Sequence, residues 1–182
     1  MGGLTDFSDF FRSFLALVAA GVASTALVLV TAVAGLAPPW PPLIIQITAI
    51  AQLLVLVIIY QNFHRAGRNR VNMLMKRGVI ALISFFLVYL AAHSLLTFSL
   101  PNGELGLRGL FCSEAAIGEY ASSCPFLEER QIADATFDDD RLWTPLGILG
   151  SRLILLIAWV GSFSSLVFII ATFVVYQRRQ NT

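Results

Sequence analysis

The chain has 182 residues, of which 57% are hydrophobic and 13% are charged, and its formal net charge is +1. Soluble proteins have about a quarter of their residues charged, so this composition excludes an ordinary soluble domain. The basic residues flank apolar runs and form no stripe with exposed aromatic residues, which argues against nucleic-acid binding. We therefore expect an all-α integral membrane protein, with residues 1–182 forming a single membrane domain in the lipid bilayer.

The first apolar run, residues 13–36, is long enough to cross a hydrocarbon layer of about 30 Å. Residues 1–12 are expected to be an amphipathic cytoplasmic lead-in, which either lies in the interface or simply begins the first span. Ala16, Ala20 and Ser24 follow one another at intervals of four residues. Small side chains at this spacing let a second helix approach closely, so we expect this face to pack against a helix of the same or a neighbouring chain.

The second apolar run, residues 43–62, follows a turn in which four prolines surround Trp40 and prevent a continuous helix. This run contains Gln46 and Gln52. Amide side chains in lipid need hydrogen-bond partners, so we expect both glutamines to face the interior of a helix bundle. Together with His93 they form a candidate intramembrane polar site.

Residues 63–77 form a basic hinge between the second and third spans. It contains no acidic residue and five basic ones, Arg65, Arg68, Arg70, Lys76 and Arg77. Positive charge next to a spanning helix resists translocation, which predicts that the hinge is cytoplasmic. The tail, residues 177–182, carries two further arginines and is expected on the same side.

The third span, residues 78–100, contains His93 in its outer half. Haem ligation by His93 together with His64 is excluded by depth, because the two residues would lie about 20 Å apart across the membrane. Two alternatives stay open for His93. It either contacts a haem or quinone alone, or it is a neutral histidine that forms hydrogen bonds with neighbouring helices.

Residues 101–145 form a long acidic loop with nine acidic residues and three arginines. Cys112 and Cys124 both lie in this loop, and in an oxidising compartment we expect a structural disulfide between them. Their spacing fits neither a C-x-x-C motif nor a zinc site, and the aspartates lack the pattern of a calcium loop, so no metal is expected. The candidate external contacts are Asp138, Asp139, Asp140 and Arg152.

The fourth span, residues 146–176, contains a second packing face with Gly161 and Ser165. The expected fold is a four-transmembrane-helix bundle with a large disulfide-closed external loop between the third and fourth helices. Both termini are then cytoplasmic, and the loop is periplasmic or extracellular. The compactness of the chain favours a bacterial inner membrane.

This plan resembles that of tetraspan membrane proteins, with both termini inside and a longer second outer loop. The Cys-Cys-Gly motif of tetraspanins is absent, and claudin-like proteins carry their cysteines between the first two spans. Proteins of the MARVEL type are similar in size and topology. The resemblance therefore implies a topology, and no functional residues are transferred from it.

The sequence contains no pattern of catalytic residues and no cofactor motif. We therefore expect a non-enzymatic integral membrane subunit, an accessory or scaffolding component of a larger membrane complex that presents its external loop for contacts. Its expected partners are other membrane subunits or copies of itself. Two alternatives stay open: a homo-oligomeric channel or pore lined by the glutamines and the serines of the fourth span, and a small protein that binds haem or quinone.

Overall fold

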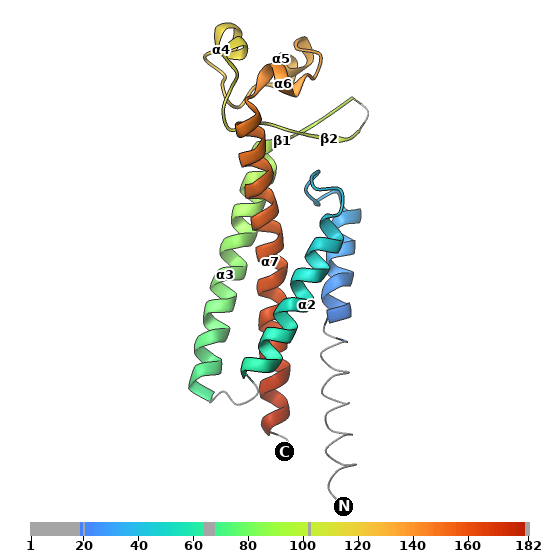
Figure 1. The fold of residues 1–182 in the computed structure, drawn as a ribbon, viewed down its shortest axis with the longest axis vertical. Helices are drawn as coiled ribbons and strands as arrows, with labels where there is room; N and C mark the ends of the chain where they lie inside the picture. The colour runs from blue at the N-terminus through green and yellow to red at the C-terminus, as the bar shows by residue number, and fades with distance from the viewer. Residues whose placement is uncertain (1–18, 20, 64–67, 102, 181–182) are drawn as a thin grey trace, which may run out of the picture. The chain divides into compact units, whose positions relative to one another are not determined.

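The structure of the chain is a computed structural model that describes residues 19, 21–63, 68–101 and 103–180 (Figure 1). The chain is mostly helical, as the composition predicts. It divides into two compact units. The first comprises Met1–Ala37, Leu43–Phe85 and Val160–Thr182, and the second comprises Pro38–Pro42 and Phe86–Trp159.

Among the residues that the structure describes, three helices are long and apolar enough to cross a membrane, which fits embedding in a bilayer. They are α2 (Ile44–Phe63), α3 (Arg68–Leu96) and α7 (Pro145–Gln180). A shorter apolar helix, Gly21–Val33, precedes them. Most of the predicted first span outside this helix, including Ala16 and Ala20, lies outside the described residues.

Helix α3 begins at Arg68, ten residues before the predicted start of the third span. Residues 68–77 of the predicted hinge are therefore helical. This segment, RNRVNMLMKR, contains no proline or glycine and is rich in residues that favour helices, so the helix continues from the apolar span into the basic segment. The basic residues from Arg68 to Arg77 therefore lie in a helix and not in a loop.

Helix α3 ends at Leu96, and the chain continues into a β-hairpin that the all-α prediction lacks. Strand β1 (Thr97–Ser99) pairs antiparallel with β2 (Leu105–Leu107). In the turn between them Gly103 has a φ of +82°, a conformation that favours glycine. The helix thus ends four residues before the predicted end of the third span, because Thr97–Ser99 pair with a strand that follows later in the sequence.

In the first unit, the short helix Gly21–Val33 packs closely against α2. A Cβ atom added to Gly21 would lie 3.1 Å from Cδ1 of Leu56, so the glycine permits this approach. Leu56 also belongs to a buried apolar cluster formed by α2 and α7, which contains Leu56, Ile59, Val167 and Ala171.

Helix α3 packs against α7 in the same unit. A Cβ atom added to Gly161 of α7 would lie 2.8 Å from Cδ1 of Phe85, and one added to Gly78 of α3 would lie 3.0 Å from Phe168 and Ile169. Both contacts depend on the absence of a side chain.

In the second unit, residues 97–144 fold into a small structure that we call the cap. Besides the hairpin it contains α4 (Glu114–Tyr120), α5 (Glu129–Asp134) and α6 (Asp139–Leu142). A buried apolar cluster with Leu127, Ile132 and Trp143 at its centre holds these elements together. The disulfide between Cys112 and Cys124 is present, with an S–S distance of 2.06 Å, which confirms the predicted pairing.

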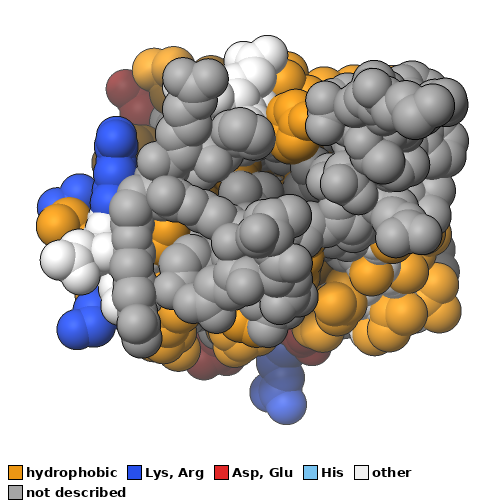
Figure 2. Space-filling view, turned by 90° about the horizontal axis from the view of Figure 1, so that it is seen from below, with side chains coloured by type: hydrophobic (Ala, Val, Ile, Leu, Met, Phe, Trp, Pro, Cys, Tyr) orange, Lys and Arg blue, Asp and Glu red, His pale blue; other side chains and the backbone are white. Residues whose placement is uncertain are grey.

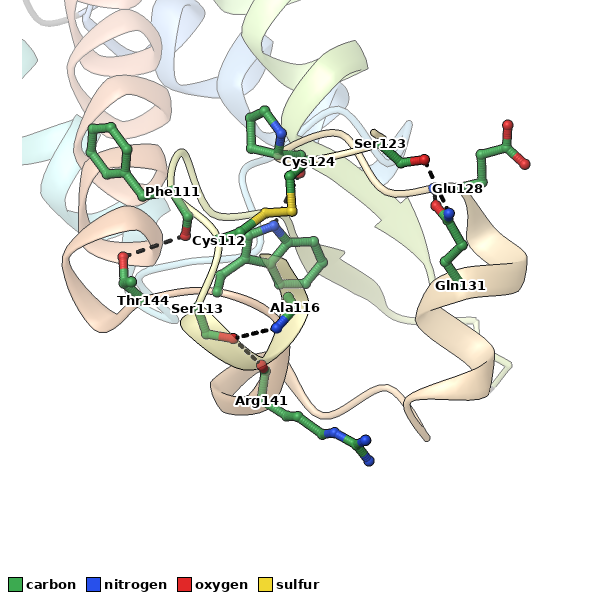
Figure 3. Close-up of a disulfide and its surroundings, with 12 residues drawn as sticks. Phe111, Cys112, Ser113, Ala116, Ser123, Cys124, Glu128, Gln131, Arg141 and Thr144 are labelled. Carbon is green, nitrogen blue, oxygen red and sulfur yellow. Dashed lines mark hydrogen bonds between the residues drawn. A yellow bond between two sulfur atoms is a disulfide. The ribbon is translucent and has the colours of Figure 1, made fainter. Parts of the chain in front are cut away.

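Side-chain hydrogen bonds determine where the cap helices begin (Figure 3). The Ser113 hydroxyl accepts a hydrogen bond from the Ala116 amide at 3.1 Å, which caps α4, and it donates to the Arg141 carbonyl oxygen, which links α4 to α6. Gln131 of α5 accepts from the Glu128 amide at 2.9 Å and donates to the Ser123 hydroxyl at 3.0 Å. The cap is therefore a folded structure with its own helices and strands.

Candidate functional site

The principal candidate site is a groove between helix Gly21–Val33 and α2, which we call the Gln52 groove. It encloses about 530 Å³, and most of its lining is apolar. Small residues, Gly21, Ala26 and Ala49, contribute to the lining together with larger side chains, Val22, Leu29, Leu53 and Val57. Along α2 the lining extends from Ala49 to Gln61, roughly 18 Å at 1.5 Å per residue.

Gln52 lies in this groove and is 2% exposed. The Thr25 hydroxyl hydrogen is shared between the Gly21 carbonyl oxygen at 3.0 Å and Gln52 Oε1 at 3.3 Å. Gln52 Nε2 is buried and has no hydrogen-bond partner among the described residues. One end of the amide is therefore paired and the other is not.

The unpaired Nε2 of Gln52 lies near the middle of the α2 span. Gln52 is eight residues after Ile44, roughly 12 Å along a helix about 30 Å long. Neither water nor lipid tails supply an acceptor in the centre of a bilayer, and each unsatisfied polar group there costs several kcal/mol. The groove thus combines an apolar surface with one unsatisfied donor at a defined depth.

Gln46 does not share this environment. The structure leaves it exposed on α2, whereas the sequence predicts that both glutamines face the bundle interior. Six residues separate the two glutamines, and at 3.6 residues per turn this places them on different faces of the helix. Only Gln52 faces the neighbouring helix.

The predicted packing residues are described only in part. Ser24 is fully buried, and its hydroxyl donates to the Gly21 carbonyl oxygen at 2.8 Å. Gly161 contacts Phe85 as described above, and Ser165 lines a second, smaller pocket with Arg77 and Ser164. Ala16 and Ala20 lie outside the residues that the structure describes.

His93 lies in the second unit, where it is half-buried on α3. Its ring centroid is 5.6 Å from that of Tyr89, which in turn lies 5.2 Å from the ring of Trp159 on α7. Its Nε2 atom has no hydrogen-bond partner in the described part of the chain. His93 thus belongs to an aromatic contact between α3 and α7, and Gln52 belongs to the other unit.

The candidate external contact residues belong to the second unit. Arg141 forms an exposed ion pair with Glu119 at 3.6 Å. The guanidinium of Arg152 lies 5.5 Å from the centre of the Trp40 ring, which is a cation–π contact. Asp138 and Asp139 lie on the cap at the start of α6, and the side chain of Asp140 lies outside the described part of the structure.

The sequence places Thr25 beside the packing face of the first span, but the sequence predictions missed its hydrogen bond with Gln52. A signal for it exists, because Thr25 lies thirteen residues before Pro38 and Gln52 lies thirteen residues after Pro39. Residues equally far from a tight turn meet in an antiparallel helix pair. The proline turn therefore pairs Thr25 with Gln52.

Comparisons of the chain with protein-family models, with curated proteins and with solved structures found no match.

Proposed function

We propose that the protein is a non-enzymatic integral membrane subunit that binds a transmembrane helix of a partner subunit in the Gln52 groove. The observation that carries this proposal is the half-paired amide of Gln52. A partner helix with a serine, threonine, asparagine or glutamine at mid-membrane supplies the acceptor that lipid tails lack. Interhelical hydrogen bonds of this kind contribute about 0.6 to 2 kcal/mol.

The shape of the groove supports a helix as its occupant. Gly21, Ala26 and Ala49 leave room for a close backbone approach, which helix packing in membranes requires. Leu53 and Val57 are 59% and 51% exposed, so they have free surface for a further helix. In this proposal the cap lies on the outer side and both termini lie in the cytoplasm, because the basic start of α3 favours the cytoplasmic side.

The cap supports a second contact with partners. Ile117 and Phe126 are 51% and 48% exposed on its surface. Large apolar side chains that are exposed on a folded domain are available for burial by a partner. We therefore include the cap as an external contact surface of the subunit.

The test compares two glutamines of the same helix. Gln52→Met keeps the approximate size of the side chain and removes its amide, and Gln46→Met is the matched control on the exposed face. The proteins are expressed at native level and purified from their own membrane in mild detergent. We expect Gln52→Met to lose partner subunits and Gln46→Met to retain them. Equal retention by both variants contradicts the proposal.

A second variant tests the groove without changing the amide. Ala26 lies in the lining, so Ala26→Phe fills part of the groove while Gln52 is unchanged. We expect this variant also to lose the partner. If the unmodified chain co-purifies only with copies of itself and Ala26→Phe loses them, the occupant is a second copy and the accessory role is wrong.

A further inference from the structure

A second pocket in the first unit lies between α2, α3 and α7. It encloses about 320 Å³, and its lining includes Arg77, Gly78, Ser164 and Ser165. Arg77 lies where the basic beginning of α3 meets its apolar part, since every residue from Gly78 to Leu90 is uncharged. The pocket therefore lies at the boundary between a positively charged segment and a membrane span.

Among the described residues of the first unit, the positive charge at this boundary has no acidic counterpart. Figure 2 shows Lys and Arg side chains gathered on the side where α3 begins. No described residue of the first unit is Asp or Glu, and no described acid forms an ion pair with Arg77. A cation at a lipid interface without a protein carboxylate attracts an anion from outside the chain.

Ser164 and Ser165 add hydroxyl groups to the pocket, and they lie deeper in the span than Arg77. Gly78 packs against Phe168 and Ile169, so Ser164 and Ser165 lie about one helical turn further along α7 toward the apolar part of α3. Neither hydroxyl has a hydrogen-bond partner among the described residues. Arg77 and, one turn deeper, Ser164 and Ser165 therefore contribute to the same pocket, whose lining is otherwise mostly apolar.

We infer that this pocket binds the head of an anionic phospholipid from the cytoplasmic leaflet. The phosphate group contacts Arg77, and the ester oxygens of the glycerol, which lie deeper than the phosphate, accept hydrogen bonds from Ser164 and Ser165. Pockets of this kind between transmembrane helices bind acidic lipid heads. Free phosphate offers the same charge to Arg77, but it has no groups at the depth of the serines.

The test measures lipid bound to the purified full-length chain by native mass spectrometry. Phosphatidylglycerol, phosphatidylcholine and inorganic phosphate are titrated separately. We expect phosphatidylglycerol to bind more tightly than phosphatidylcholine, and excess inorganic phosphate to leave it bound. Equal affinity for the two lipids overturns the proposal, and so does displacement by inorganic phosphate, which identifies a site for free anions.

Lys76 provides the matched control, because it is also basic and exposed but does not line the pocket. We expect Arg77→Gln to weaken phosphatidylglycerol binding about five-fold, which corresponds to ~1 kcal/mol. Lys76→Gln should weaken it much less. Equal weakening by both variants shows only a diffuse surface charge and overturns the inference.

The serines provide a variant that keeps the charge. Ser164→Ala combined with Ser165→Ala should weaken binding of phosphatidylglycerol and leave the weak binding of inorganic phosphate unchanged. Unchanged lipid affinity in this double variant contradicts the assignment of the ester oxygens to the serines. Because alanine favours helices, the double variant is expected to keep α7 intact.

Discussion

The indole Nε1 of Trp143 donates a hydrogen bond to the carbonyl oxygen of Pro125 at 3.1 Å. The Trp143 side chain is fully buried, and its backbone forms a β-bridge with Cys112. Pro125 directly follows Cys124. Trp143 therefore connects the segment before α7 to both ends of the disulfide ring, through its backbone at Cys112 and through its side chain at Pro125.

Replacement of Trp143 should destabilise the cap in two steps. Trp143→Phe removes the donor and is expected to cost about 1 kcal/mol of the free energy of unfolding of the cap. Trp143→Ala also leaves a cavity and is expected to cost about 3–5 kcal/mol. Hydrogen exchange of the cap amides in the full-length protein measures both effects. The control is Phe111→Leu, because Phe111 is 62% exposed. Unchanged protection in Trp143→Ala contradicts the central role of this residue.

Loss of the disulfide should loosen the cap but not the membrane helices. The double variant Cys112→Ser, Cys124→Ser opens a ring with a sequence separation of 12 residues. A ring of this size contributes roughly 3 kcal/mol in the chain-entropy account. We expect faster proteolysis between the two positions, and reduction of the wild-type chain should reproduce it. Equal proteolysis rates in the variant and the wild type would show that the apolar core alone holds the cap.

A side chain at Gly161 should disturb the packing of α3 against α7. Gly161→Leu forces atoms into the space of the Phe85 ring and is expected to cost about 1–3 kcal/mol. Gly118 is the control, since no atom lies within 4 Å of a Cβ added there. Gly118→Ala should stabilise α4 by about 0.5–1 kcal/mol. Thermal unfolding of the full-length protein compares the two. A Gly161→Leu variant as stable as the wild type would contradict the close approach.

Apolar runs locate two of the three long apolar helices closely. The predicted second span, 43–62, and fourth span, 146–176, differ little from α2 and α7. The disulfide is also predictable, because its two cysteines are the only ones in the chain. The beginning of α3 is not predictable, since basic residues are compatible with both a loop and a helix. The hairpin escapes prediction for another reason: Thr97–Ser99 continue an apolar run, and only pairing with Leu105–Leu107 makes them a strand.

The candidate site is predictable only in part. The sequence indicates that buried amides need partners, which selects Gln46 and Gln52 together. Gln46 and Gln52 differ because the helix Gly21–Val33 covers only one side of α2. Which side it covers is known only from the packing of the two helices. The second pocket could not be predicted from the sequence for the same reason, because Ser164 and Ser165 are far from Arg77 in the chain.

The central claim is that a helix of another subunit occupies the Gln52 groove. The most direct measurement is native mass spectrometry of the unmodified chain, extracted gently from its own membrane without overexpression. The account predicts that the chain is detected in complex with other membrane subunits. Detection of the chain only alone or with copies of itself would contradict it.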